Sequence, residues 1–364
     1  MENDKTKLLI VDDSLVFRKA VEAAIGSDPT IDVTGSVRNG KLAIDEIIRN
    51  PPDIVTLDVE MPEMDGLQTL NEIEKINSGA GRPGISVIML SAFTSEGAET
   101  TMKALDAGAF DFITKPESPS LEKNISELQK ELLRKIACWK SHSRKPPMQA
   151  IRRVIAKPVR EQHQASGINA IVIGVSTGGP KALNEMLPDL CAVTTLPILI
   201  VQHMPPTFTK SLAEQLDKKC SHSIVEGSDG VEVKEKFVYI APGGRHMTVK
   251  NALESKIIAI NDMPPEGGCR PSVNMLFRSA AESYGAKCLG IILTGMGNDG
   301  TSGAASLRNG GARIIAQDSA TSTIWGMPGS AAAAGNVDYI KPLMEIPSEV
   351  QRLINLMQVN HGNK

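Results

Sequence analysis

The sequence is poor in cysteine, lacks any long apolar run and carries almost no net charge. Its five cysteines are scattered through 364 residues without a Cys-x-x-Cys pair, so they suggest neither zinc nor a disulfide framework. The formal net charge of −3 gives no global bias toward nucleic acid or a membrane surface. No apolar run is long enough to span a bilayer. The first residues, MENDKTKLLIVDD, carry acids before their apolar run, so no signal peptide is expected.

These absences favour a reduced, cytoplasmic protein without membrane insertion. What the sequence does contain is an alternation of short apolar runs with amphipathic segments at helical spacing. Between Lys7 and Lys140 the runs are KLLIVDD, IDVTGSV, DIVTLDV, SVIMLSA and DFITKP. From Asn169 they are AIVIGVS, LPILIVQH, KFVYIAP, SKIIAIN, CLGIIL and ARIIAQ. We therefore predict an α/β protein with two doubly wound parallel-sheet domains.

A basic segment separates the two alternating halves. Residues 139–160 contain seven Lys or Arg, three prolines and no acid. This composition favours a solvated tether, with a basic docking segment as the alternative. We place the first domain at residues 5–123, a helix end and linker at 124–166, and the second domain at 167–358.

Charged and hydroxyl side chains follow the strands predicted in the first domain. Asp12 and Asp13 end the first strand, Asp58 the third, Ser91 the fourth and Lys115 the fifth. Any one of these acids could simply cap a helix. Together they would meet at one edge of a parallel sheet, where carboxylates repel unless a cation lies among them. Oxygen ligands suit Mg²⁺, beside which a carboxylate can accept a phosphoryl group.

The motifs IVDDS, LDVEMPEMDG, LSA and FDFITKP make the first domain resemble a response-regulator receiver domain, which has a flavodoxin-like fold. The resemblance implies phosphorylation at Asp58 by a histidine kinase. The Mg²⁺ site of that family corresponds here to Asp12, Asp13, Asp58 and the backbone carbonyl of Glu60. Its switch residues correspond to Ser91, Phe112 and Lys115.

Three polar residues follow strands predicted in the second domain. Ser176 lies in a Gly-x-Ser-x-Gly pattern at a strand-to-helix turn, where it is either a nucleophile or a helix cap. A Walker A loop is excluded because Pro180 stands where its lysine should be. His203 ends the next strand and Asp299 follows CLGIILTGMGN. Serine, base and orienting acid at one sheet edge predict a hydrolase triad.

The loop around Asp299 also has the spacing of a dinucleotide fingerprint, Gly295-x-Gly297-x-x-Gly300, with Asp318 near the place of a ribose-binding acid. A carboxylate inside a pyrophosphate loop would repel the ligand by about 1–4 kcal/mol. The fingerprint normally opens its domain, whereas only 64 residues follow Gly300. The acid disfavours a nucleotide site, although Asp318 leaves that alternative open.

Longer motifs make the second domain resemble the chemotaxis protein-glutamate methylesterases, the CheB family. They are GVSTGGPKAL, HMPPTFTKSLAEQLD, APGGRHM, RPSVNMLFRSAA, LTGMGNDG and AQDSATSTIWGMPGSA. The resemblance implies an α/β methylesterase domain in which Ser176 is the nucleophile, His203 the base and Asp299 the orienting acid. Thr177 and Met296 correspond to active-site neighbours whose backbone N–H groups suit an oxyanion hole.

The implied function is hydrolysis of glutamate γ-methyl esters on the cytoplasmic helices of chemoreceptors, with glutamine deamidation as a second activity and no cofactor for hydrolysis. The hypothesis for control is that the unphosphorylated receiver blocks the catalytic edge and that phosphorylation at Asp58 relieves the block. Three other classes are alternatives: a dinucleotide-dependent enzyme, a non-catalytic scaffold, and a transcriptional regulator, for which the sequence shows no helix-turn-helix.

Overall fold

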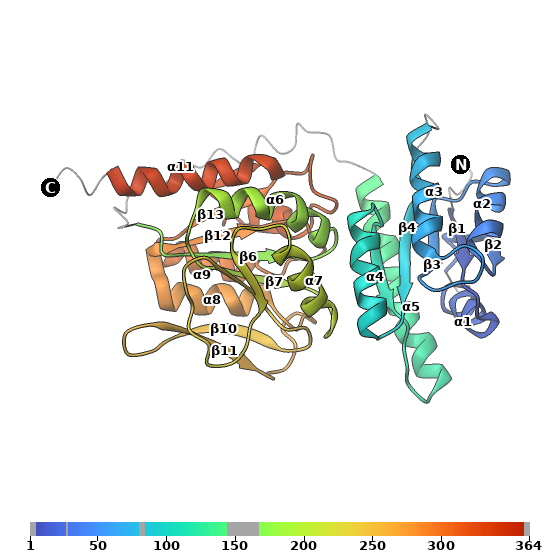
Figure 1. Cartoon of the computed structure of the whole chain (residues 1–364), viewed down its shortest axis with the longest axis horizontal. Coiled ribbons are helices and arrows are strands. Elements are labelled where there is room, and N and C mark those ends of the chain that lie inside the picture. Colours follow the sequence, from blue (N-terminus) through green and yellow to red (C-terminus); the bar gives the residue numbers. More distant parts are fainter. Residues whose placement is uncertain (1–4, 27, 80–83, 144–166, 360–364) are drawn as a thin grey trace. The chain divides into compact units, whose positions relative to one another are not determined.

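The computed structural model describes residues 5–26, 28–79, 84–143 and 167–359 (Figure 1). The chain divides into two compact units, with the division after Lys140. Most of the linker predicted at 124–166 lies outside the described residues, but its first part belongs to helix α5 (Leu121–Ser143). The Trp139 indole N–H donates to Ser86 Oγ at 2.9 Å, which ties α5 to the first unit.

The first unit is a five-stranded parallel sheet in the order β2-β1-β3-β4-β5. Its strands are β1 (Thr6–Val11), β2 (Ile31–Val37), β3 (Ile54–Asp58), β4 (Ser86–Ser91) and β5 (Asp111–Thr114). Its other helices are α1 (Leu15–Ile25), α2 (Gly40–Arg49), α3 (Gly66–Gly79) and α4 (Ser95–Asp106). Buried apolar residues of β1, β3, β4 and β5 form one core with α1 and α5. Continuous apolar runs suit these strands because both faces of the sheet are covered.

The second unit is built on a seven-stranded parallel sheet in the order β14-β13-β12-β6-β7-β9-β8. Its strands are β6 (Ala170–Val175), β7 (Ile198–Gln202), β8 (Ser223–Glu226), β9 (Phe237–Ile240), β12 (Cys288–Ile292), β13 (Arg313–Gln317) and β14 (Tyr339–Lys341). Its helices are α6 (Gly179–Val193), α7 (Phe208–Asp217), α8 (Val273–Tyr284), α9 (Thr301–Asn309), α10 (Met327–Ala333) and α11 (Ile346–Val359). Helices α6 and α11 pack together on one face of the sheet, and α8 and α9 on the other (Figure 1).

One predicted strand of the parallel sheet is wrong. The run SKIIAIN forms β11 (Lys256–Asn261), which pairs antiparallel with β10 (His246–Asn251) in a separate hairpin. The connection is a short turn in which the Ala252 N–H donates to Ser255 O at 2.9 Å. So short a turn can join only antiparallel neighbours, because a parallel pair needs a crossover connection.

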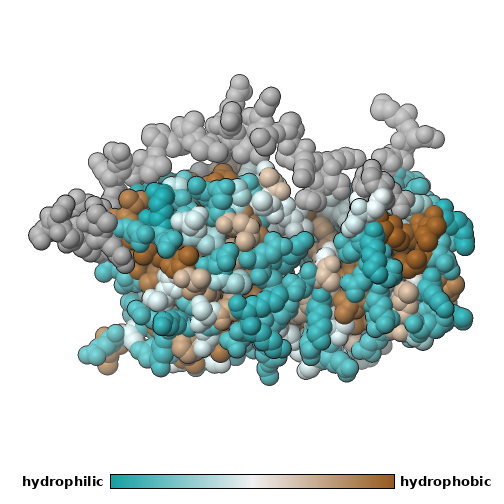
Figure 2. All heavy atoms as spheres, turned by 45° about the horizontal axis from the view of Figure 1, so that its top comes forward, coloured by the Kyte–Doolittle hydropathy of each residue, from teal (hydrophilic) through white to brown (hydrophobic). Residues whose placement is uncertain are grey.

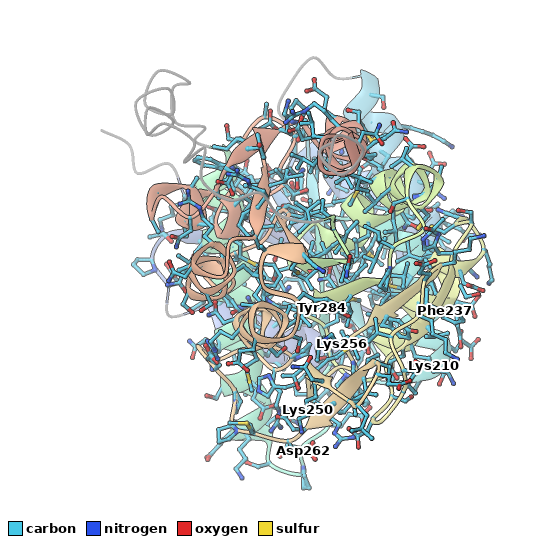
Figure 3. All side chains as sticks on the ribbon, turned by 90° about the vertical axis from the view of Figure 1, so that its left-hand side faces the viewer. Lys210, Phe237, Lys250, Lys256, Asp262 and Tyr284 are labelled. Atoms are coloured by element: carbon cyan, nitrogen blue, oxygen red, sulfur yellow. The ribbon has the colours of Figure 1, made fainter. Side chains whose placement is uncertain are left out.

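The hairpin packs on the outer side of α8. The Val249 N–H donates to Ser279 Oγ at 3.0 Å, and Lys256 Nζ lies 5.6 Å from the centroid of the Tyr284 ring (Figure 3). Figure 2 shows a mostly hydrophilic visible surface interrupted by separate hydrophobic patches. Among the described residues, no helix is both long and apolar enough to cross a membrane.

Candidate active site

Three neighbouring strands bring the predicted triad to one edge of the second sheet. Ser176 follows β6, His203 follows β7 and Asp299 lies in the loop after β12. These strands are adjacent in the order β12-β6-β7 and all run parallel. Their carboxyl ends therefore share the edge at which ligands bind in open α/β sheets.

A sharp turn places Ser176 between β6 and α6. Gly178 has a φ of +76°, and a Cβ there would lie 2.4 Å from Thr323 Oγ1. A Cβ on Gly179 would lie 1.9 Å from Gln202 Oε1. The Ser176 carbonyl accepts hydrogen bonds from the Gly179 N–H at 2.8 Å and from Gln202 Nε2 at 3.0 Å. A side chain at either position would force its neighbours to move, and Gln202, which the sequence did not single out, holds the turn.

Asp299 is buried and surrounded by hydrogen-bond donors. Its Oδ2 accepts from the Val273 N–H at 2.7 Å and from His203 Nε2 at 2.9 Å. Its Oδ1 accepts from Ser272 Oγ, the Asn274 N–H and the Gly300 N–H. Burial would raise the pKa of the Asp299 carboxyl, but these bonds, led by that from His203, hold it below its ordinary value. The start of α8 thus orients the acid.

His203 is oriented through Nε2, which leaves Nδ1 as the ring nitrogen able to accept a proton. Burial would lower the pKa of His203, but the neighbouring Asp299 and Cys269 side chains raise it to about 9. Within the described residues, the imidazole makes no hydrogen bond to Ser176 Oγ. The histidine–aspartate half of the triad is therefore formed and the serine–histidine half is open, as is common before substrate binds.

The predicted neighbours Thr177 and Met296 lie on two chain segments that pass close to Ser176. Thr177 follows it directly, and its carbonyl accepts from Thr294 Oγ1 at 3.0 Å. Met296 follows Gly295, where a Cβ would lie 2.8 Å from Ser176 Cβ. Both segments therefore run close to Ser176.

Cys269 is a site residue that the sequence analysis did not assign. Its Sγ, a ring nitrogen of His203 and a carboxylate oxygen of Asp299 all lie within 4.8 Å of one another. No local pattern around this cysteine indicates the contact, because the three residues come from distant segments of the sequence.

The predicted acidic cluster also forms, at the carboxyl edge of the first sheet. Asp12, Asp13 and Asp58 each offer a carboxylate oxygen within 4.8 Å of the others. Lys115 Nζ lies 2.7 Å from Asp12 Oδ2 and 2.8 Å from Asp58 Oδ1. Burial raises the pKa of Asp58 to about 6, with Lys115 opposing this shift and Asp12 and Asp13 adding to it. Three carboxylates facing one ammonium fit a hard divalent cation such as Mg²⁺.

The remaining residues predicted for the receiver lie around this cluster. Ser91 Oγ donates to the Gly97 carbonyl at 3.2 Å and accepts from Thr101 Oγ1 at 2.8 Å, so it bonds α4 rather than Asp58. Phe112 is buried in β5, and Glu60 is exposed in the loop after β3.

Comparisons with known proteins agree with this arrangement. The model of the CheB methylesterase family matches residues 171–350, and that of the response regulator receiver domain matches residues 8–126. A protein-glutamate methylesterase/protein-glutamine glutaminase of Desulfotalea psychrophila is 40% identical, with 96% of this chain and 99% of that protein covered. The chain belongs to the CheB methylesterase family.

Further members of the family give the same result. A protein-glutamate methylesterase/protein-glutamine glutaminase of Pyrococcus horikoshii is 39% identical over 97% of this chain and 95% of that protein. The solved CheB methylesterase catalytic domain of Thermotoga maritima is 41% identical, with a TM-score of 0.50. The match covers 51% of this chain and 99% of that domain. The predicted resemblance, a receiver domain followed by a methylesterase domain, is confirmed.

The glycine loop of this CheB-family chain does not resemble an open phosphate site. Helix α9 begins at Thr301, and two N–H groups at its start are occupied: Asn274 Oδ1 accepts from Gly300 at 3.0 Å and from Gly303 at 2.8 Å. Those are the groups that would bind a pyrophosphate in a dinucleotide fold. Asp318 Oδ1 accepts from the N–H and Oγ1 of Thr321 and so closes a turn after β13. Both features disfavour the dinucleotide alternative.

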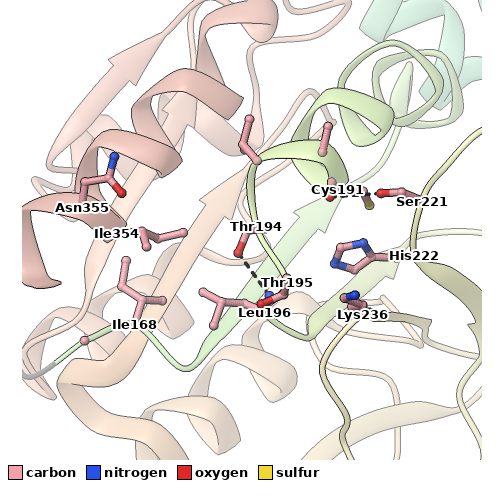
Figure 4. Close-up of a pocket in the computed structure, with 13 residues that line it drawn as sticks. Ile168, Cys191, Thr194, Thr195, Leu196, Ser221, His222, Lys236, Ile354 and Asn355 are labelled. Carbon is pink, nitrogen blue, oxygen red and sulfur yellow. Dashed lines mark hydrogen bonds between the residues drawn. The ribbon is translucent and has the colours of Figure 1, made fainter.

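A cavity of about 480 Å³ lies at the opposite edge of the sheet (Figure 4). Ile168, Leu196, His222 and Lys236 line it, each just before a strand begins. Ser221 Oγ is also there, but it donates to the Cys191 carbonyl at 3.1 Å. The Ser221 hydroxyl therefore bonds the end of α6.

Proposed function

We propose that this chain hydrolyses γ-methyl esters of glutamate, and deamidates glutamine, on the cytoplasmic helices of chemoreceptors. The observation that carries the proposal is the hydrogen bond from His203 to Asp299 at the sheet edge where the Ser176 turn also ends. Family membership supports the substrate class, because relatives that match 96–97% of the chain are named protein-glutamate methylesterase/protein-glutamine glutaminase.

In the proposed mechanism Ser176 Oγ attacks the ester carbonyl and His203 Nδ1 accepts its proton. Asp299 holds Nε2 protonated and stabilises the imidazolium. Backbone N–H groups near Thr177 and Met296 stabilise the oxyanion. The imidazolium then protonates the leaving methoxide, and methanol departs. Water, deprotonated by the same imidazole, hydrolyses the acyl-enzyme and restores Ser176.

We further propose that phosphorylation of Asp58 by a histidine kinase relieves inhibition of this hydrolase. Mg²⁺ held by Asp12, Asp13, Asp58 and the Glu60 carbonyl would neutralise phosphoryl charge. Lys115 already contacts Asp58 and would pair with the phosphoryl group. Ser91 would exchange its bonds to α4 for one to a phosphoryl oxygen, and Phe112 would respond to that change. A local charge thereby biases a two-state surface.

Release of methanol from methylated receptor membranes tests the hydrolase. We expect Ser176→Ala to reduce release to the background of the membranes alone. Ser348→Ala is the matched control, because this serine is exposed on α11. Undiminished release by a folded Ser176→Ala protein would remove the central claim.

A further inference from the structure

The contact between Cys269 and the triad brings together three kinds of metal ligand. A thiol, an imidazole and a carboxylate offer atoms that all lie within 4.8 Å of one another. Zn²⁺ binds sulfur at about 2.3 Å and nitrogen or oxygen at about 2.0–2.2 Å, which in a tetrahedral site sets the ligand atoms about 3.3–3.6 Å apart. Small side-chain shifts therefore suffice to close this group around one ion.

The thiol is held in place by a tight hairpin turn. Glu266 and Cys269 exchange backbone hydrogen bonds at 3.1 and 3.0 Å. Gly267 and Gly268 between them have φ values of +59° and +82°, the conformation that such a two-residue turn requires. Glu266 also forms an ion pair with Arg278 of α8. Helix α8 thus holds the Glu266–Cys269 turn through Arg278 and holds Asp299 through the N–H groups of its first turn. Both contacts fix the thiol relative to the carboxylate.

We propose that His203, Cys269 and Asp299 bind a thiophilic divalent cation such as Zn²⁺ and that the bound cation inhibits the hydrolase. Binding releases the thiol proton and any second proton on the imidazole to solvent. A neutral imidazole has one nitrogen lone pair, and once the metal takes it the ring cannot accept the Ser176 proton. The inhibitory part of this inference rests on the proposed function, whereas metal binding does not.

This site and the acidic cluster of the receiver offer different types of metal ligand. The receiver carboxylates Asp12, Asp13 and Asp58 offer oxygen only, which suits Mg²⁺. The sulfur and nitrogen of Cys269 and His203 favour Zn²⁺ or Co²⁺. Excess Mg²⁺ should therefore occupy the receiver and leave the thiol site to the softer ion. The cysteine spacing suggested no zinc, because this site uses a single cysteine and two ligands far from it in the sequence.

Cobalt absorption tests the site without reference to activity. Reduced, full-length protein in excess Mg²⁺ is titrated with Co²⁺, whose bond to a thiolate gives a near-ultraviolet charge-transfer band. We expect the band in wild type, in Ser176→Ala and in Cys220→Ser, a control at another partly exposed cysteine. Cys269→Ser should lose it and bind Zn²⁺ at least about tenfold more weakly in competition with a chelator. A band undiminished in Cys269→Ser would overturn the proposal.

Zinc inhibition of methanol release tests the consequence, with each variant compared with its own metal-free rate. Half-inhibition of Cys269→Ser should need at least roughly tenfold more Zn²⁺ than wild type, and a zinc-selective chelator should restore the wild-type rate. Equal zinc sensitivity of the two proteins would refute the inhibitory role. If Ser176→Ala kept full activity while the cobalt band still required Cys269, the hydrolase assignment would fall and the metal site would stand.

Discussion

His203 lies between two groups that stabilise its protonated form. Asp299 and Cys269 raise its pKa to about 9 although burial opposes them. The protonated ring cannot accept the Ser176 proton, so only enzyme molecules with a neutral His203 are active. Their fraction grows as the pH rises through this pKa. A group with a raised pKa loses its proton as the pH rises, and the esterase rate should rise in the same direction.

We therefore expect kcat/KM on a soluble methyl ester to increase with pH and to level off above about pH 9. Asp299→Asn removes a group that raises the pKa, so the midpoint should move to lower pH and the plateau should fall by about 10³–10⁴. The profiles are measured with a zinc-selective chelator present. A midpoint identical in both proteins would contradict the role of Asp299.

At the scale of elements, the first turns of α8 and α9 are joined by hydrogen bonds. Asn274 of α8 accepts from the N–H groups of Gly300 and Gly303, and α9 has no capping side chain of its own at Gly300. The same loop carries Asp299, whose carboxylate accepts from the start of α8. Asp299, the proposed acid of the triad, is thus positioned by the first turns of two helices that share hydrogen-bond partners.

Asn274→Ala should expose this dependence. The buried Gly303 N–H would lose its acceptor, and the Gly300 N–H would keep only its bond to Asp299, so we expect the free energy of unfolding to fall by about 1–3 kcal/mol. The esterase rate should fall as well, because the Asp299 loop loses its anchor. Urea unfolding and methanol release measure the two effects. Asn309→Ala, at the exposed end of α9, is the control. Equal stability of the two variants would argue against a stabilising role of the bonds from Gly300 and Gly303 to Asn274.

The sequence predicted the central strands and the triad for one physical reason. Buried parallel strands are continuous apolar runs, and residues that follow them meet at one edge, which located Ser176, His203 and Asp299. Strands β8 and β14 were not predicted because they are short and partly exposed, and β10 was not predicted because its residues HMTVKN are mostly polar. The position of Cys269 beside His203 and Asp299 could not be predicted either. It depends on the Glu266–Cys269 turn, which an ion pair between Glu266 and Arg278 attaches to α8. This contact joins separate segments, and no local pattern indicates it.

At the scale of the whole molecule, two chemistries are carried by sheets of the same type. Each sheet gathers its functional side chains at the carboxyl ends of parallel strands. In the receiver these are acids with one lysine, and burial together with neighbouring acids raises the pKa of Asp58 to about 6. A further negative phosphoryl group at this edge requires a cation, so Mg²⁺ should be needed for any response to phosphorylation.

Phosphorylation of the first domain should change the hydrolase activity of the second domain in the full-length chain. With Mg²⁺ and a small phosphodonor, the methanol-release rate of wild type should rise roughly 5- to 150-fold, the range of ordinary allosteric coupling. Asp58→Ala lacks the acceptor carboxylate and should keep its unstimulated rate under the same conditions. Asp45→Ala removes an exposed acid of α2 and should respond like wild type, which controls for a general charge effect. Removal of Mg²⁺ should abolish the wild-type response because the carboxylates would then repel the incoming phosphoryl group. Equal rates for wild type and Asp58→Ala would separate the receiver from catalysis, whereas loss of the response in Asp58→Ala alone would place the control at that carboxylate.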